Sequence, residues 1–492
     1  MTGDTTPTGF LGVDIGTGSL RTVLVSDDGD VRASAAVRYE TLRGPRGEAE
    51  QNPSDWTAAL ATAMSMMRLD APPASVGLCG QTPTIVFVDE ENQPVRPAMT
   101  WQDTRASREA AELADALGPP ESLFGTNLAW SASNIPARLA WVARHEPETR
   151  RRSVAVLQAK DYLGAYLTGV AVSDPWSSKG LCHVGDLAPA SAVLAASGWS
   201  DEHCPELRRA WDLAGVVSAA AAAETGLAPG TPVSVGWSDA LAEILASGCY
   251  ADQSAFFFSG TSSIVGAALR HDDLRAPGLF NVPRSCAPAA LLYGPTQSGG
   301  AALVWVARLL GVRVDELSAL AASASGSAPV FVPYLSGERA PLWNSSVRAL
   351  FAGLDESHGP AEIALSVLLS VIMSARHILE LVETASAEPI EFVETVGRGV
   401  GDPAWEDIAR RGCGLSLRLH SDQDMSARGA AMLGAACTGG DLASISRQLA
   451  DPTRVVEVRD GDVEESRRLL RLFNDASRHA LEWQAANAKG EG

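Results

Sequence analysis

The sequence lacks the features that mark membrane and secreted proteins. Its 492 residues contain no stretch of about 18 uncharged apolar residues, which is roughly the length needed to cross a membrane. The first ten residues, MTGDTTPTGF, have neither the basic region nor the apolar region of a signal peptide. We therefore expect a cytoplasmic protein without a membrane partner.

Paired cysteines and basic clusters are also missing. The seven cysteines are scattered singly, so we expect reduced thiols and no disulfide framework. Lysine and arginine number 39 against 59 acidic residues, and the net charge is -20. Such a chain repels phosphate backbones, which argues against nucleic acid as a partner. An anionic nucleotide is not excluded, because backbone N–H groups and Mg²⁺ can neutralise its phosphates.

The remaining composition is that of a globular protein, and its length predicts two large domains. Apolar runs of strand length alternate with helical patterns, which predicts α/β structure. Strands are expected in 10–16, 21–26, 75–80, 84–89, 153–158, 232–236, 255–269, 329–335 and 391–397. Helices are expected in 53–67, with Ser54 as the N-cap, in 160–169, and near 361–384 and 464–486.

The two halves of the chain open in the same way. Gly16-Thr17-Gly18-Ser19 and Gly260-Thr261-Ser262-Ser263 each follow an apolar strand and precede an alternating one. Their offset of 244 residues (260 minus 16) is close to half of the 492-residue chain. We therefore predict a duplicated architecture with domains at 1–246 and 247–492.

The two turns predict a phosphate site. Consecutive small residues can present backbone N–H groups to a polyphosphate, and Asp14 at the first strand end can hold a hydrated Mg²⁺ beside it. Alone, the first turn is equally typical of a Gly-rich hairpin, but the matching second turn favours phosphate binding. The residues concerned are Gly16, Thr17, Gly18 and Ser19 in the first turn, and Gly260, Thr261 and Ser262 in the second.

Two further segments carry candidate groups for a polar ligand. Asp239 follows a strand and begins a helix, where it is either a general base in a cleft or an ordinary N-cap. Gln81 and the segment TWQDTR, with Trp101 and Asp103, offer the amide, carboxylate and aromatic groups that bind sugar hydroxyls. The alternative for TWQDTR is a surface turn with a local Asp–Arg pair.

A glycine-rich turn occurs late in the chain, in VGRGVGDPAWEDIARRG at 396–412. Gly397, Gly399 and Gly401 would let an adenine ring approach the backbone, and Pro403 suits the first turn of a following helix. The pattern does not fit a dinucleotide fingerprint, because no acidic residue ends a strand about 20 residues later.

Taken together, the chain resembles the FGGY carbohydrate kinase family, whose members include xylulokinases, ribulokinases, gluconokinases and glycerol kinases. The resemblance spans nearly the whole length, with the motifs in the expected order. These motifs are GVDIGTGSLRTVL, AEQNPSDW, GLCGQTPTIVFVD, TWQDTR, AKDYLGAYLTG, GWSDALAEILASG, FFSGTSS, SGGAALVWVARLLG, YLSGERAPLWNSSVRALFAGL, VGRGVGDPAWEDIARRGCGL and SARGAAMLGA.

The resemblance implies two duplicated actin-like (ribonuclease H-like) domains with mixed β-sheets flanked by helices around a central cleft. It implies an ATP- and Mg²⁺-dependent kinase that phosphorylates a hydroxyl of a small sugar or polyol, with a ketopentose such as xylulose as the first candidate. By position, Asp14 would organise Mg²⁺ and Asp239 would be the general base. Gln81, Trp101 and Asp103 would then contact the sugar.

The other implied contacts are with ATP. The two predicted phosphate turns would bind its phosphates, and 397–401 would border its adenosine, so the domain at 1–246 would carry the sugar site and the domain at 247–492 the adenosine site. The expected partners are thus a sugar or polyol and ATP, with a homodimer as one option for assembly.

Three positions depart from the family pattern and three other functions stay open. Thr82-Pro83 replace the Met-His pair of xylulokinases, Arg398 replaces a glycine, and Leu369 replaces an acidic or amide residue. A family member that senses a ligand without transferring phosphate, and a glycerol kinase-like enzyme, are the alternatives. A superfamily ATPase that drives conformational change is a further one, against which the sugar-side cluster argues.

Overall fold

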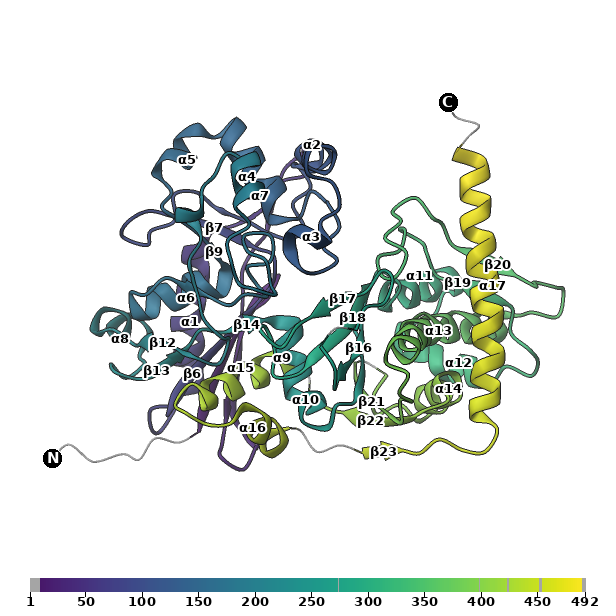
Figure 1. Ribbon diagram of the computed structural model, residues 1–492. Coiled ribbons are helices and arrows are strands. Elements are labelled where there is room, and N and C mark those ends of the chain that lie inside the picture. The colour runs from purple at the N-terminus through teal and green to yellow at the C-terminus, as the bar shows by residue number, and fades with distance from the viewer. Residues whose placement is uncertain (1–8, 273, 398, 423, 451–453, 489–492) are drawn as a thin grey trace. The chain divides into compact units, whose positions relative to one another are not determined.

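The computed structural model describes residues 9–272, 274–397, 399–422, 424–450 and 454–488, which form two compact α/β units (Figure 1). The first unit comprises Met1–Ala251, Val282–Pro288 and Asp424–Ala450, and the second comprises Asp252–Asn281, Ala289–Gln423 and Asp451–Gly492. The domains predicted from the sequence divide the chain once, at 246. These units differ mainly in that 424–450 packs with the first unit.

The first unit is built on a seven-stranded mixed sheet of order β12-β13-β6-β1-β2-β3, in which β14 also pairs with β6. Its central strand β1 is antiparallel to β2 and parallel to β6. A five-stranded sheet, β4-β5-β8-β7-β9, and a short pair, β10-β11, complete it. The strands are β1 Phe10–Ile15, β2 Ser19–Val25, β3 Val31–Arg38, β4 Leu42–Arg43, β5 Ala49–Gln51, β6 Ser75–Gly80, β7 Ile85–Val88, β8 Ala98–Met99, β9 Ala155–Gln158, β10 Val172–Ser173, β11 Glu206–Leu207, β12 Leu213–Val216, β13 Pro232–Ser234 and β14 Trp237–Ser238.

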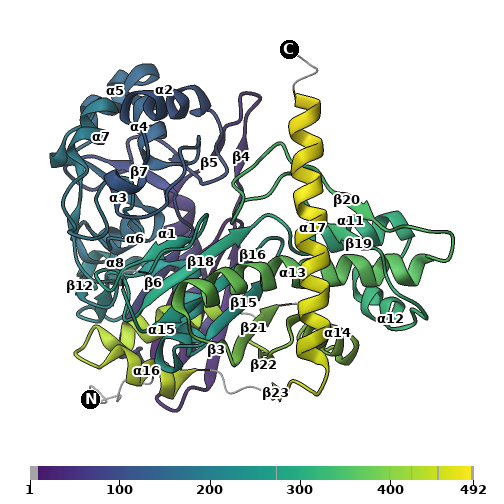
Figure 2. The same ribbon diagram turned by 45° about the vertical axis from the view of Figure 1, so that its right-hand side comes forward.

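Helices cover both faces of this sheet (Figure 2). Apolar side chains of α1 and α6 pack on one face, whereas α9 and α15 lie on the other. The helices of the unit are α1 Pro53–Met67, α2 Ser107–Leu117, α3 Glu121–Phe124, α4 Ile135–His145, α5 Pro147–Arg152, α6 Ala159–Thr168, α7 Ser191–Ala196, α8 Ala219–Thr225, α9 Asp239–Ala246, α10 Cys249–Asp252, α15 Met425–Ala436 and α16 Leu442–Leu449, with a short 3₁₀ helix at Asp201–His203.

Glycines on the sheet let α15 approach it at backbone distance. A Cβ on Gly12 of β1 would lie 1.8 Å from the carbonyl oxygen of Ala427, and one on Gly77 of β6 would lie 1.6 Å from that of Ala430. Because no side chain fits at either position, the backbone of α15 rests directly on β1 and β6. This contact joins a helix from residues 425–436 to strands that begin more than 340 residues earlier.

The second unit repeats the opening of the first. Its seven-stranded sheet has the order β17-β18-β16-β15-β21-β22-β23, with β15 antiparallel to β16 and parallel to β21, and β19-β20 form a short pair. The elements are β15 Ala255–Ser259, β16 Ser263–Leu269, β17 Phe280–Val282, β18 Ala290–Thr296, α11 Gly300–Leu310, α12 Leu317–Ala322, β19 Val330–Val332, β20 Leu350–Ala352, α13 Pro360–Ser386, β21 Phe392–Gly397, α14 Pro403–Cys413, β22 Ser416–His420, β23 Arg454–Val456 and α17 Asp462–Ala488, with a 3₁₀ helix at Val314–Glu316.

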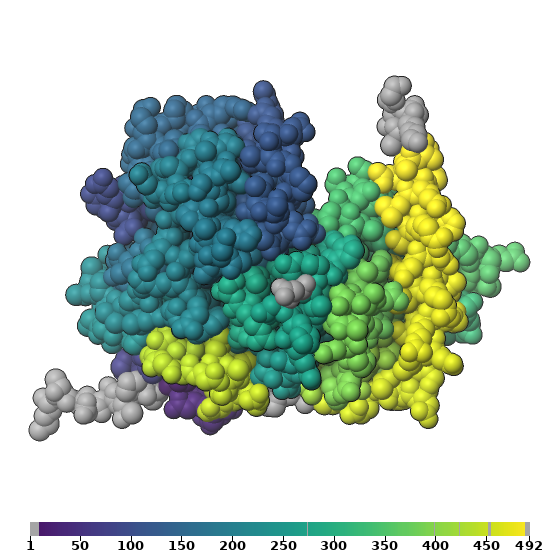
Figure 3. All heavy atoms as spheres, viewed as in Figure 1, coloured from purple at the N-terminus to yellow at the C-terminus, as the bar shows by residue number. Residues whose placement is uncertain are grey.

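The core of the second unit is formed by the sheet with α11, α13, α14 and α17. In the part of the chain that the structure describes, α13 is the one helix with the length and apolarity of a membrane span, and most of its apolar side chains are buried in this core. Helix α17, yellow in Figures 1 and 3, runs along the surface of the second unit.

The mixed sheets flanked by helices confirm the predicted α/β class, and the β1–β2 and β15–β16 hairpins confirm the repeated opening. One local prediction is wrong. The N-cap of α1 is Asn52, whose side chain accepts a hydrogen bond from the N–H of Ser54 at 3.3 Å, so that Ser54 lies inside the helix. The reason is Pro53, whose fixed φ suits the first helical position and so places the cap one residue before it.

Candidate active site

Asp14 lies near the carboxyl end of β1 and is buried. Its carboxylate accepts hydrogen bonds from Ser426 Oγ at 2.8 Å and from Cys79 Sγ at 3.5 Å. Burial raises the pKa of Asp14 above its usual range, and the two hydrogen bonds act in the opposite direction. Ser426 lies in the first turn of α15, whose backbone packs directly on β1 and β6. Its hydroxyl therefore has a fixed position and holds the Asp14 carboxylate in one orientation.

Asp239 lies at the same end of the strands as Asp14, on the other side of β6. In the parallel ladders, Ser238 of β14 pairs with Gly80, and Asp14 of β1 pairs with Cys79. Asp239 follows β14 directly and is the first residue of α9. The alternative of an N-cap is therefore wrong, since Ser238 occupies the cap position, and the Asp239 carboxylate accepts a hydrogen bond from the N–H of Ala240 at 2.8 Å.

The two carboxylates influence each other. Burial, followed by repulsion from Asp14, raises the pKa of Asp239 to about 7, although the residue keeps part of its surface exposed. Such a carboxyl group is divided between its ionised and protonated forms near neutral pH, which suits a group that accepts a proton during a reaction.

The turn between β1 and β2 is tight and partly exposed. The N–H of Gly16 donates to the carbonyl of Ser19 at 3.0 Å, and no acceptor for the N–H groups of Thr17 and Gly18 lies in the described parts of the protein. The side-chain amide of Gln51 holds the turn by donating a hydrogen bond to the carbonyl of Thr17 at 2.6 Å. The turn can therefore offer free N–H groups to an anion.

The turn between β15 and β16 is one residue tighter: the N–H of Gly260 donates to the carbonyl of Ser262, two residues later, at 3.0 Å, whereas Gly16 reaches the third residue after it. The start of α11 closes on it, since the N–H groups of Gly300 and Ala301 donate to the carbonyls of Gly260 and Thr261 at 2.8 and 3.1 Å. A Cβ on Gly300 would lie 2.6 Å from that Gly260 oxygen, so only glycine allows this contact.

The predicted adenosine turn lies beside this second phosphate turn. Gly397 ends β21 and pairs with Ser259, the residue before Gly260. Gly399 packs against the ring of Trp405, where a Cβ would come within 2.2 Å of a ring carbon, and Gly401 has a φ of 95° that favours glycine. Asp402 caps α14 ahead of Pro403. Arg398 lies outside the described residues.

The predicted sugar-side residues divide into two groups. Trp101 is 39% exposed, and its Nε1 donates to Thr17 Oγ1 at 3.1 Å, so it stands beside the first phosphate turn. Gln81 is buried, and its Nε2 donates to Gln51 Oε1 at 2.7 Å.

Asp103 is fully buried, and both of its carboxylate oxygens are used inside the protein. They accept hydrogen bonds from the N–H of Ala49 at 3.0 Å and from Arg105 Nε at 3.0 Å. For Asp103 the structure shows the local Asp–Arg pair that was kept as the alternative.

We expect Asp103→Ala to destabilise the first unit. It would leave Arg105, whose side chain is 6% exposed, with Glu50 as its remaining counterion, and removing one partner of a buried ion pair costs about 3–5 kcal/mol. Differential scanning calorimetry should show a lower Tm than for wild type. Asp115→Ala, at an exposed site on α2, is the control and should leave Tm unchanged; equal Tm values for both variants would contradict the structural role of Asp103.

Three residues at the site were not assigned a role from the sequence. Gln51 and Ser426 lie within AEQNPSDW and SARGAAMLGA, but nothing in those segments reveals that their partners are Thr17 and Asp14. The third, Lys179, influences the pKa of Asp239. In the sequence, Lys179 could have been noticed only because lysine is rare: the chain contains three lysines, Lys160, Lys179 and Lys489.

Mg²⁺ would have few protein ligands here. No three His, Cys, Asp or Glu side chains of the described residues come together as a ligand set for a metal ion. Mg²⁺ beside a nucleotide usually keeps several waters and takes its other ligands from one or two carboxylates and phosphate oxygens. A single buried carboxylate next to an exposed turn, as at Asp14, fits that coordination.

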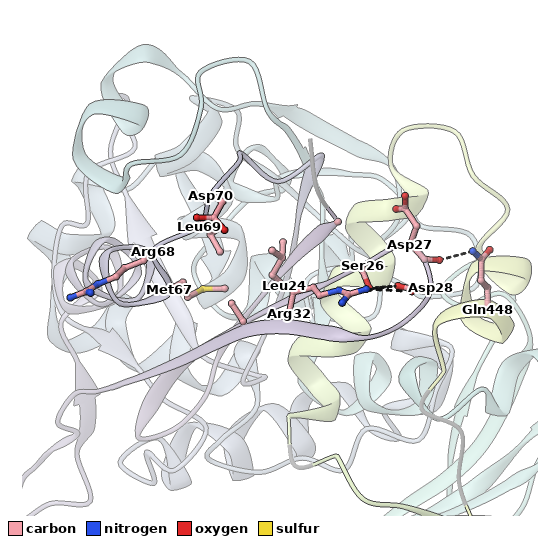
Figure 4. Close-up of a pocket in the computed structure, with 12 residues that line it drawn as sticks. Leu24, Ser26, Asp27, Asp28, Arg32, Met67, Arg68, Leu69, Asp70 and Gln448 are labelled. Atoms are coloured by element: carbon pink, nitrogen blue, oxygen red, sulfur yellow. Dashed lines mark hydrogen bonds and ion pairs between the residues drawn. The ribbon is translucent and has the colours of Figure 1, made fainter. Parts of the chain in front are cut away.

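A separate cavity of about 910 Å³ opens at the opposite edge of the same sheet. Figure 4 shows that it is lined by the β2–β3 connection, the end of α1 and Gln448, whose side chain donates to the carbonyl of Asp27 at 2.7 Å. Leu24, near the end of β2, lines this cavity, whereas Asp14 stands near the other end of the hairpin. It contributes nothing to the candidate active site.

Comparison with known proteins gives this geometry a context. The model of the N-terminal domain of the FGGY family of carbohydrate kinases matches residues 10–246, and the model of its C-terminal domain matches residues 255–437. The chain belongs to the FGGY family of carbohydrate kinases. The predicted family is thereby confirmed, as is an enzyme that phosphorylates a sugar.

Several members of the FGGY family match over most of their length. The chain is similar to the xylulose kinase of Klebsiella pneumoniae (30% identity, 86% of this chain and 89% of the relative) and to that of Bacillus subtilis (25%, 97% and 98%). It is also similar to the gluconokinase of Bacillus subtilis (24%, 95% and 95%). A crystal structure titled as a xyloylose kinase from Brucella ovis superposes with a TM-score of 0.85 at 27% identity, over 98% and 99% of the chains.

Proposed function

We propose that the enzyme transfers the terminal phosphoryl group of ATP to a hydroxyl of a small sugar or polyol, with a ketopentose such as xylulose as the first candidate. The observation that carries this proposal is the pair of carboxylates, Asp14 and Asp239, on the two sides of the end of β6. The xylulose kinases among the similar proteins support a ketopentose.

In this proposal the carboxylates have different tasks. Asp14, buried and fixed by Ser426, would hold Mg²⁺, which neutralises phosphate charge when bound. Asp239, partly exposed, would orient the attacking hydroxyl in line with the phosphoryl group and take its proton late in the transfer. The pKa of about 7 leaves a large share of Asp239 ionised at neutral pH.

Each turn has a proposed role in its own unit. Gly16, Thr17, Gly18 and Ser19 would bind phosphate oxygens through backbone N–H groups. The same role is proposed for Gly260, Thr261 and Ser262, and Gly397, Gly399 and Gly401 would border the adenosine. The domains at 1–246 and 247–492 would thus carry the sugar and adenosine sites.

On the sugar side, Trp101 and Gln81 are the proposed contacts. Trp101 offers an exposed aromatic face beside the phosphate turn, and Gln81 Oε1 is a buried acceptor without a partner among the described residues. Asp103 acts in this proposal by holding the TWQDTR segment through Arg105 rather than by binding the sugar. A cytoplasmic location and a homodimer stay predictions.

The test is a coupled ADP assay over ketoses, aldoses, sugar acids and polyols. Turnover that rises with a ketopentose supports the proposal. Highest turnover with glycerol would favour a glycerol kinase-like enzyme, and sugar binding in calorimetry without ADP formation would favour the alternative of a sensor.

Removing the hydroxyl that fixes Asp14 should weaken the use of Mg²⁺. A hydrogen bond to a charged group contributes about 1.5–3 kcal/mol, so we expect Ser426→Ala to raise the Mg²⁺ concentration for half-maximal activity by about tenfold or more. Titration of activity and of nucleotide binding with Mg²⁺ measures this. Ser444→Ala, which removes a hydroxyl on the neighbouring helix α16, is the control; equal Mg²⁺ requirements in both variants would contradict the role of Ser426.

A further inference from the structure

Lys179 lies in the segment that follows β10 and is partly buried. Its ammonium group donates to the carbonyl of Trp176 at 3.2 Å and lies 4.8 Å from the centroid of the Trp176 ring. Among the described residues no carboxylate oxygen comes within 4.0 Å of it. Lys179 is therefore a cation enclosed by protein without a paired anion, an arrangement that costs free energy.

The other buried lysine shows what a structural lysine looks like in this chain. Lys160 pairs with two buried carboxylates, Asp161 and Asp174, the latter at 3.0 Å. All other cations of the described residues apart from histidine are arginines, so lysine stands only at these two positions. Arginine presents a broad planar group that stays charged, whereas lysine presents a compact point charge whose pKa shifts readily on burial.

Lys160 also links the segment of Lys179 to the segment between β13 and β14 that leads to Asp239. Its ammonium group contacts both the Asp174 carboxylate, five residues before Lys179, and the carbonyl of Val235 at 3.4 Å, four residues before Asp239. The charges of Lys179 and Asp239 act on each other: burial lowers the pKa of Lys179 to about 8, and Asp174 and Asp239 oppose that shift. Lys179 thus stays mostly protonated at pH 7, and its charge lies near enough to Asp239 for each to act on the other.

The reaction needs positive charge at this place. Asp14 and Asp239 are both carboxylates, and neither phosphate turn contains a basic side chain. During transfer, charge spreads over the three equatorial oxygens of the phosphoryl group, and catalysis depends on groups placed to stabilise it.

We propose that Lys179 is a further catalytic residue, whose ammonium group donates hydrogen bonds to the phosphoryl group as it passes to the acceptor hydroxyl. This inference rests on the proposed kinase function. In the step, the acceptor oxygen bonds to the γ-phosphorus, and the bond from that phosphorus to the bridging oxygen breaks with its electrons leaving on ADP. The hydroxyl proton moves to Asp239. Lys179 stays protonated throughout, and Trp176 holds it in position.

The test compares Lys179→Met, which keeps length and removes the charge, with wild type. Since an interaction made in the transition state is removed, kcat should fall about 10²-fold, while KM for ATP and for the sugar changes less than about threefold. Lys179→Arg should restore only part of the rate, because its planar group cannot take the place of a compact ammonium. A normal kcat in Lys179→Met, or a raised sugar KM with normal kcat, would overturn the proposal.

A second measurement does not depend on knowing the sugar. ADP with aluminium fluoride mimics the phosphoryl group in transfer, so calorimetry should show about 10²-fold weaker binding of this pair to Lys179→Met and equal binding of ADP alone. If Lys179→Met bound ADP with aluminium fluoride as tightly as wild type does, the role of Lys179 would be overturned, even if no sugar substrate were found. If the variant bound this mimic more weakly but wild type phosphorylated no sugar, the role of Lys179 would stand and only the proposed sugar acceptor would be wrong. Lys160→Met, which removes the paired lysine, should lower Tm instead, and Lys179→Met should not.

Discussion

Replacing Asp239 by asparagine is expected to lower kcat about 10³-fold while nucleotide binding is retained. Asparagine keeps the size of the side chain and can still hydrogen-bond, but it cannot accept the proton of the attacking hydroxyl, and positioned acid–base groups contribute about 10²–10⁴-fold. Asp14 and the turn at 16–19 are untouched by the change. Single-turnover phosphorylation and calorimetry with a non-hydrolysable ATP analogue measure the two effects separately.

The pH profile provides a control for this substitution. Burial and Asp14 raise the pKa of Asp239 to about 7, and the protonated form cannot act as a base. The kcat of wild type should therefore fall on the acid side of about pH 7, by tenfold per unit once Asp239 is mostly protonated. Asp239→Asn should lack this acid limb. Near-normal transfer by the variant, or an acid limb that persists in it, would remove Asp239 from the mechanism.

The second large effect concerns packing. We expect Gly77→Ala to destabilise the first unit by about 3 kcal/mol or more, since the added Cβ would lie 1.6 Å from the Ala430 carbonyl oxygen and backbone must move to admit it. A loss of that size lowers Tm by roughly 6–12 °C for a unit of this order of size. Because α15 carries Ser426, residual folded protein should also need more Mg²⁺.

The matched change is Gly326→Ala, where no atom lies within 4 Å of the new Cβ. Scanning calorimetry of the two variants beside wild type tests the backbone contact between α15 and β6. A Tm for Gly77→Ala as high as that of Gly326→Ala would show that α15 does not rest on the sheet as described.

Local patterns in the sequence predicted most of the fold. The strands around Asp14 and Gly260 and the helices near 361–384 and 464–486 lie where apolar periodicity placed them, because each element buries one face of its own segment. The repeated hairpins were visible as repeated residues. Ser54 was misplaced because the preference for serine at a cap competes with the stronger constraint of Pro53.

Contacts between distant segments could not be predicted in the same way. Ser426 and Asp14 are 412 residues apart, and no local pattern says that a serine in a small-residue helix will meet a particular carboxylate. Asp103 illustrates a different limit, since one sequence, TWQDTR, is compatible with a sugar contact and with an internal ion pair. Only the position of Ala49 and Arg105 around the carboxylate separates them.

The most direct test of the account is sugar-dependent phosphoryl transfer by the purified wild-type chain. We expect ADP formation in the presence of Mg²⁺ to increase on adding a ketopentose, with a phosphorylated sugar detected by mass spectrometry, and both signals to be lost in Asp239→Asn. ATP turnover that no ketose, aldose, sugar acid or polyol increases, with no phosphorylated product from any of them, would contradict the account.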